Sequence, residues 1–210
     1  MDGSNPVYVP GHDAHTRIVP NADSNLFDGT QTYILLADQK GIPMHDQLTE
    51  EELASLSELM DLEKAAAIAV TCIGRLYELG GNVVQLCGPM STGGRGHIDL
   101  NMARFRIAME VMHEHGVQVF NQMVFQDMMI RITGFRPGMP VEEYNVQILE
   151  GFYGPVFHSG LITTAIFLPD WESSHGASWE RELLKKLGVE ILEYPTSWFA
   201  EVQRREALIT

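Results

Sequence analysis

The sequence predicts an α/β protein, with a parallel sheet of four to five strands flanked by helices and a helical appendage at the N-terminus. From residue 83 onwards, short apolar runs alternate with longer amphipathic segments, which is the pattern of a repeated strand–helix unit. The runs are apolar on both faces, as expected for strands that are covered on each side by helices. With 45% apolar and 20% charged residues, the composition is that of a globular protein.

The chain is expected to divide into an appendage, residues 1–81, and an α/β domain, residues 82–210. Residues 1–29 are rich in Pro, Gly, Asn and Asp, which indicates irregular structure. Residues 30–38 contain an apolar run that predicts a short strand.

Two helices are predicted to complete the appendage. Thr49 and Glu52 have the spacing of a capping box and mark the start of the first helix. The second helix begins near Asp61 and ends at Gly80 and Gly81, because glycine readily adopts the left-handed conformation that terminates a helix. Their amphipathic pattern carries no chemical signal.

The α/β domain is predicted from apolar runs and from helices that end in glycine. Strands are expected at residues 83–87, 117–121, 163–168 and 189–192. Helices are expected at residues 99–115 and 142–152, in a segment that ends at residues 186–188, and from Pro195 through Val202. Residues 123–140 favour no single structure.

The charge balance excludes some classes of partner. There are 14 Lys and Arg against 28 Asp and Glu, which gives a net charge of −14. Binding to nucleic acid polymers or to anionic membranes needs clustered basic residues, so neither is expected. Cys72 and Cys87 fit reduced thiols, and no leader or membrane-spanning run is visible, so a cytoplasmic location is expected. No cofactor or metal is expected, since His12, Asp13 and His15 fit solvated residues better than ligands.

Ligands of parallel α/β sheets bind at the carboxyl ends of the strands, which singles out residues 88–98 and residues 169–179. The first loop holds four glycines and Arg95 and precedes a helix. Free backbone amides at a helix N-terminus, together with a guanidinium group, favour an anion such as phosphate. An ordinary strand-to-helix loop that needs glycine for its turns is the alternative.

The second loop is rich in acids, hydroxyls and histidine, and Glu180 follows it near the start of a helix. The helix dipole is expected to keep this carboxylate ionised. An ionised carboxylate in a cleft can act as a nucleophile at an anomeric carbon. The alternative is that Glu180 and Glu182 only complement the helix dipole.

Two segments together resemble the nucleoside 2-deoxyribosyltransferase superfamily, in particular its short uncharacterised members. They are LCGPMSTGGRGHIDLNMARFRIAMEVMHEHGVQVFN and IFLPDWESSHGASWERELLKKLGVEI, within residues 83–195. The first loop is also similar to that of the 2'-deoxynucleoside 5'-phosphate N-hydrolases, with one extra residue. The resemblance implies a flavodoxin-like Rossmannoid fold and attack on the N-glycosidic bond of a nucleoside or nucleotide.

The resemblance also implies roles for individual residues. Glu180, four residues after Gly176, stands where the family has its nucleophile, and Ser174 stands where the nucleotide hydrolases have a serine, which favours a 5'-monophosphate. Residues that would hold the sugar, base or phosphate are Gly88, Pro89, Met90, Gly93, Gly94, Arg95, Ser174, Gly176 and Trp171. Trp171 would stack on the base or else pack the loop. No Asp stands near His158 where some related members have one, which leaves Asp170, His158 or His175 to protonate the leaving base.

The expected function is therefore cleavage or transfer of the N-glycosidic bond of a nucleoside 5'-monophosphate by a homodimer or higher homo-oligomer. Two alternatives stay open. One is a nucleotide-binding module without catalysis, in which residues 88–97 bind phosphate. The other is an interaction protein that uses the helices of residues 49–79 as a dimer surface.

Overall fold

The computed structural model describes residues 17–18, 35–36, 46–134 and 146–209. The strands are β1 (Arg17–Ile18), β2 (Leu35–Leu36), β3 (Val83–Cys87), β4 (Ile162–Phe167) and β5 (Glu190–Glu193). The α-helices are α1 (Glu50–Glu58), α2 (Leu62–Gly80), α3 (Ile98–Glu114), α4 (Gln126–Thr133), α6 (Gly154–His158), α7 (His175–Lys186) and α8 (Thr196–Glu206). Short 3-10 helices η2 (Gln122–Phe125) and η4 (Trp171–Ser173) and a π-helix η3 (Leu149–Tyr153) connect them.

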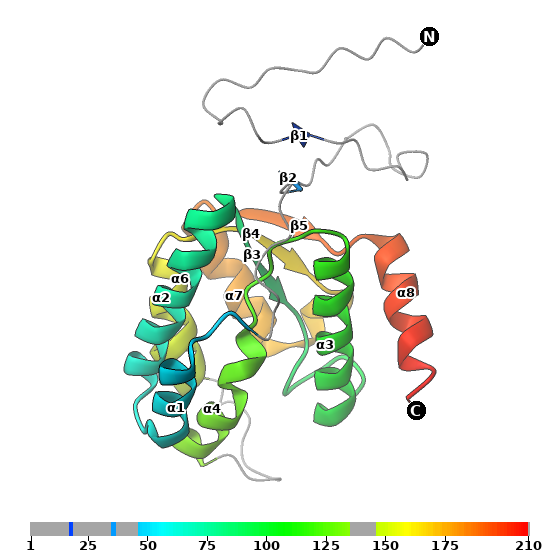
Figure 1. Cartoon of the computed structure of the whole chain (residues 1–210). Helices are drawn as coiled ribbons and strands as arrows, with labels where there is room; N and C mark the ends of the chain where they lie inside the picture. The colour runs from blue at the N-terminus through cyan, green and yellow to red at the C-terminus, as the bar shows by residue number, and fades with distance from the viewer. Residues whose placement is uncertain (1–16, 19–34, 37–45, 135–145, 210) are drawn as a thin grey trace.

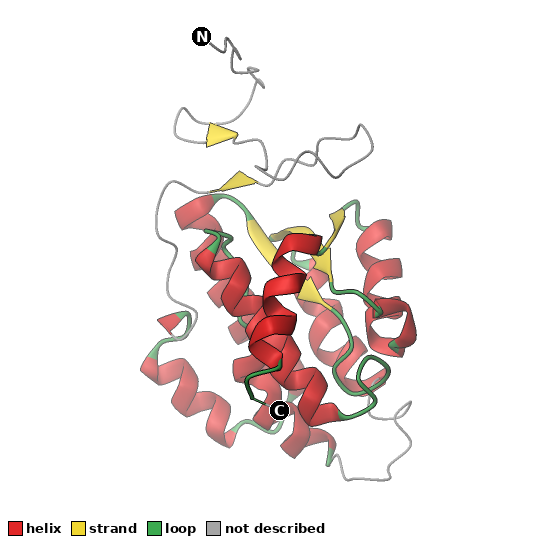
Figure 2. Cartoon of the chain, turned by 90° about the vertical axis from the view of Figure 1, so that its right-hand side faces the viewer, coloured by secondary structure: helices red, strands yellow, loops and turns green. Residues whose placement is uncertain are grey.

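The central sheet is parallel, with the strand order β3-β4-β5. The α/β class and the parallel direction are therefore confirmed. The predicted count of four to five strands is not reached in the described part of the chain, where this sheet has three. Figure 2 shows how short these strands are beside the helices that surround them.

The strand predicted at residues 117–121 is reduced to a single parallel bridge between Val119 and Val84. Val84 donates its amide to Gln118 O and accepts from the amide of Phe120, both at 2.9 Å. On the other side, the Gln47 side chain donates to Val119 O and accepts from the Asn121 amide, both at 2.8 Å. A glutamine side chain thus closes this edge where a further strand would pair.

Helices cover both faces of the sheet (Figure 1). Alternate residues of β3 point to opposite sides, so Val83 and Cys87 join one hydrophobic cluster while Val84 and Leu86 join another. The first cluster contains residues of α2, α4, η3, α6 and α7, and the second contains residues of α3 and α8. Because β3 is buried on both faces, all of its residues except Gln85 are apolar.

The predicted caps of the two early helices are present. Thr49 and Glu52 form the capping box of α1, and the Asp61 side chain accepts the amides of Glu63 and Lys64 at the start of α2. Gly81, with φ of +68°, ends α2. Of the strand predicted at residues 30–38, only Leu35–Leu36 lies within the described residues, where it pairs antiparallel with Arg17–Ile18.

Helix α2 packs into the same hydrophobic cluster as the sheet. Ala66, Ala69 and Ile73 are fully buried there together with Val83 of β3 and Ile162 of β4. The expected boundary between residues 81 and 82 thus lies within one shared cluster. Helix α2 therefore forms part of the layer that covers the sheet.

Among the described residues, no helix is long and apolar enough to cross a membrane.

Candidate functional site

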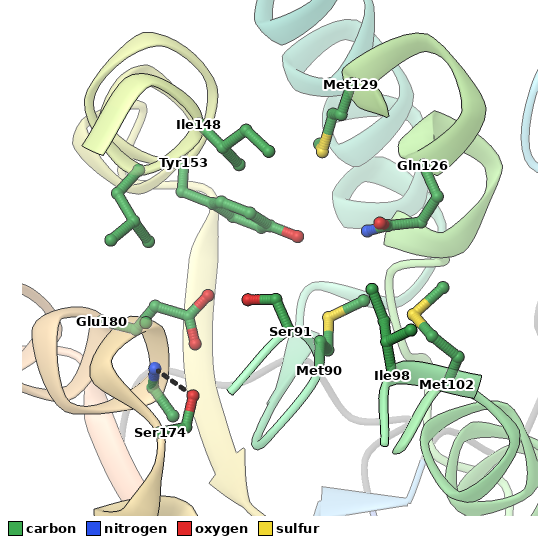
Figure 3. A pocket seen from close by; sticks show the side chains of 13 residues that line it. Met90, Ser91, Ile98, Met102, Gln126, Met129, Ile148, Tyr153, Ser174 and Glu180 are labelled. Carbon is green, nitrogen blue, oxygen red and sulfur yellow. Dashed lines mark hydrogen bonds between the residues drawn. The ribbon is translucent and has the colours of Figure 1, made fainter. Parts of the chain in front are cut away.

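A pocket opens where the chain leaves β3 and β4 at their carboxyl ends (Figure 3). Its volume is about 60 Å³. Its walls are mainly apolar, with three methionines, and a few polar groups converge on it, as is typical of small-ligand sites. It is lined by Met90, Ser91, Ile98, Met102, Gln126, Met129, Ile148, Leu149, Tyr153, Ser174, Gly176, Ala177 and Glu180.

Glu180 is the acidic side chain of this pocket. Helix α7 presents it from the second turn, and only 7% of the residue is exposed. Burial raises the pKa of its carboxyl from 4.5 to about 8, while a hydrogen bond with the Cys87 thiol acts in the opposite direction. A buried carboxyl with a raised pKa in a cleft is a candidate catalytic group.

The expected effect of the helix dipole, which would keep the pKa of Glu180 low, is outweighed by burial, which raises it. Helix α7 begins at His175, so Glu180 is its sixth residue. The field of a helix dipole fades within the first turn and does not offset the loss of hydration that raises this pKa. Burial therefore raises the pKa of Glu180 well above its usual value.

The glycine-rich loop does not present a row of free amides. The Gly94 amide donates to Ser173 Oγ at 2.8 Å, and the Arg95 amide donates to Asn101 Oδ1 at 2.8 Å. The Gly96 amide donates to Gly93 O at 3.1 Å. These bonds fasten the loop to η4 and to helix α3. Three of its amides therefore have structural partners, as expected for an ordinary strand-to-helix loop.

Arg95 and Ser174, the two side chains expected to hold a phosphate, have other partners. The guanidinium of Arg95 lies 3.8 Å from the Glu206 carboxylate on α8, and Arg95 does not line the pocket. Ser174 lines the pocket, but its hydroxyl accepts the Ala177 amide at 3.3 Å and so caps α7. A side chain that already caps a helix has less capacity left for a ligand.

Of the residues predicted for the site, Met90, Ser174, Gly176 and Glu180 line the pocket, whereas Gly88, Pro89, Gly93, Gly94, Arg95, Asp170, Trp171 and His158 do not. Gly88 packs against the side chain of Leu168. The ring of Trp171 lies 4.3 Å from the Arg181 guanidinium, an arrangement that packs the loop.

None of the three candidates for the proton donor lines this pocket. Asp170 is exposed, and its backbone carbonyl accepts the Ser173 amide at 3.0 Å. His158 is exposed at the end of α6, just before the amino end of β4. Glu180 lies at the other end of the strands, where their carboxyl ends meet the pocket. His175 is exposed, and its amide donates to Thr92 Oγ1 at 3.2 Å.

The structure adds polar residues that sequence reasoning missed. Ser91 follows β3 in the loop that the strand-end rule singles out, so a signal for it existed. Gln126 begins α4 in a segment for which the sequence favoured no structure, and Tyr153 lies on the helix that precedes β4. No motif or strand-end position marks these two residues, because the fold brings them to the pocket from elsewhere in the chain.

Within the described residues, no group of three or more His, Cys, Asp or Glu side chains is placed to hold a metal ion. His12, Asp13 and His15 lie outside them. Comparisons with protein-family models, with curated proteins and with solved structures find no match for this chain.

Proposed function

We propose that the protein cleaves the N-glycosidic bond of a nucleoside or nucleotide, with Glu180 as the nucleophile. The observation that carries this proposal is a buried carboxyl with a raised pKa that faces a mainly apolar pocket at the carboxyl ends of β3 and β4. The flavodoxin-like arrangement, the membership of the deoxyribosyltransferase superfamily and the homo-oligomer implied by the resemblance belong to the same proposal.

The lining of the pocket supports this proposal. Its methionine and isoleucine walls suit the flat apolar face of a base, and thioether sulfur makes favourable contacts with aromatic rings. The ionised form of Glu180 attacks C1′ through an oxocarbenium-like transition state and forms a glycosyl-enzyme intermediate. Water then releases the sugar, or a second base replaces water, which gives hydrolysis or transfer.

No basic side chain of the pocket would bind a 5'-phosphate. The pocket lining contains no Lys, Arg or His. Helix α3 begins beside the pocket at Ile98, and its N-cap residue, His97, makes no side-chain cap. The amides of this helix end are the feature that favours an anionic group near the mouth. The small volume means that part of a nucleotide would lie outside the enclosed space.

Incubation with a panel of ribo- and deoxyribonucleosides and their monophosphates, followed by chromatography for free base, tests the proposal. We expect Glu180→Gln to lower base release by about a thousandfold or more, because the nucleophile is lost. Glu182 is an exposed carboxylate on the same helix, so the Glu182→Gln variant should keep wild-type turnover. Unchanged turnover in Glu180→Gln would overturn the assignment, and binding without release by the wild type would favour a non-catalytic module.

The pH dependence of kcat/KM distinguishes a nucleophile from an acid. The pKa of Glu180 is raised to about 8, and a nucleophile acts in its deprotonated form. We therefore expect kcat/KM to rise about tenfold per pH unit below this value and to level off above it. A rate that falls as pH rises through 8 would assign Glu180 as the acid instead.

A further inference from the structure

Tyr153 reaches the pocket from one turn of π-helix. The helix around residues 146–158 widens at η3, where the amide of Gly154 donates to the carbonyl of Leu149, five residues earlier. Pro155 follows directly and has no amide to donate, which interrupts the regular α-helical pattern. Single π turns are rare in proteins overall, but many of those that occur lie at functional sites. Leu149 and Tyr153, the two ends of this turn, both line the pocket.

The ring of Tyr153 contacts two other aromatic rings. Phe152 lies edge-on with a centroid distance of 5.1 Å, and Phe157 is tilted at 5.8 Å. Only 4% of Tyr153 is exposed. Packed aromatic contacts of this kind fix the direction of a side chain. Figure 3 shows its hydroxyl projecting into the pocket, as the Glu180 carboxyl and the Ser91 hydroxyl do from other elements.

The lining offers few groups that can release a proton to a ligand. Besides Glu180, these are the hydroxyls of Ser91, Ser174 and Tyr153 and the amide of Gln126. A phenol is the most acidic of these, since its reference pKa is about 10, whereas alcohols and amides do not act as acids near neutral pH. Tyr153 is the only phenol in this lining.

We propose that Tyr153 is the catalytic acid that protonates the departing base while Glu180 acts as the nucleophile. The inference rests on the proposed function and deepens it. It also replaces Asp170, His158 and His175, which lie outside the pocket lining.

The step balances as follows. A carboxylate oxygen of Glu180 forms a bond to C1′ while the bond from C1′ to the base nitrogen breaks. The electron pair of that bond goes to the nitrogen, which takes the phenolic proton of Tyr153. Water then attacks C1′, the ester bond to Glu180 breaks and restores the carboxylate, and the proton of the water returns to the phenolate.

Two substrates that differ in their need for an acid test this role. An unmodified purine nucleoside releases its base only with protonation, whereas the N7-methylated nucleoside already carries the positive charge and releases a neutral base. We expect Tyr153→Phe to lower kcat on the unmodified nucleoside by about a hundredfold and to change kcat on the methylated one less than about threefold. Tyr194→Phe, which removes a buried hydroxyl bonded to Ala108 O in the opposite cluster, serves as the control and should leave the ratio unchanged.

The losses measured on the two substrates distinguish a catalytic role of Tyr153 from a structural one. An equal loss on both substrates would assign Tyr153 a structural role, and no loss on either would remove it from the reaction; both results overturn the inference while the proposed function stands. If the wild type releases no base from the two nucleosides or from their 5'-monophosphates, the proposed function and this inference are both overturned.

Discussion

Replacement of Glu180 by Gln should stabilise the protein at pH 8 by on the order of 3–5 kcal/mol. In the folded protein the Glu180 carboxyl has a pKa of about 8, whereas the ordinary value is 4.5. Between these two values the unfolded chain loses this proton and the folded chain keeps it. The contribution of Glu180 to the free energy of unfolding is therefore complete below about pH 4.5 and declines until the pH passes 8. Glutamine has no such proton to lose.

Urea unfolding at pH 4, 6 and 8 measures this difference directly. The gap between Glu180→Gln and the wild type should be small at pH 4 and should widen to its full value at pH 8. Other carboxyl groups titrate equally in both proteins and cancel in the comparison. Glu182→Gln should show no comparable widening, since Glu182 is exposed. A gap that is the same at every pH, or a variant less stable than the wild type at pH 8, would contradict the burial argument.

Stability gained together with activity lost would identify Glu180 as a functional residue. A structure that keeps a carboxyl buried against its preference for water loses stability to do so. Active sites commonly carry such a cost, because the same loss of hydration makes the ionised group more reactive.

Gly93→Ala should lower the free energy of unfolding by about 3 kcal/mol or more. Gly93 has φ of +68°, and a Cβ atom there would lie closer than 3.0 Å to the carbonyl oxygen and the hydroxyl of Ser173. Backbone atoms cannot move aside as a flexible side chain can. Loop and η4 would therefore separate and break the bond from the Gly94 amide to Ser173 Oγ.

Gly96→Ala is the matched control for this effect. Gly96 has φ of +74°, but a Cβ atom there meets no atom within 4 Å. This variant therefore carries only the backbone strain of a left-handed residue, about 1 kcal/mol. Urea unfolding of both variants should separate the two contributions. Equal losses would mean that the close approach of the loop to η4 does not contribute to stability.

Much of the secondary structure could be predicted from local sequence. The capping box at Thr49, the left-handed glycine at Gly81 and the apolar run of β3 act through neighbouring residues, so their signals are visible in a short window. The strand predicted at residues 117–121 became one bridge because pairing at an edge depends on distant partners. Gln47, which occupies that edge, lies 72 residues before Val119.

The candidate site was predicted less completely than the fold. The strand-end rule led to the loops after β3 and β4, and Glu180, Ser174, Gly176 and Met90 do line one pocket. The same rule also led to Arg95, whose guanidinium lies near Glu206, a residue that the fold brings from α8.

By itself, the sequence determined an α/β fold with a parallel sheet and the edge of the sheet at which a pocket forms. These depend on the periodicity of apolar residues and on the common direction of the strands, both of which are properties of the chain order. Only the tertiary structure decided that helix α2 belongs to the core, that Tyr153 reaches the pocket and that the pKa of Glu180 is raised. Burial sets each of these, and burial results from contacts between segments that lie far apart in the sequence.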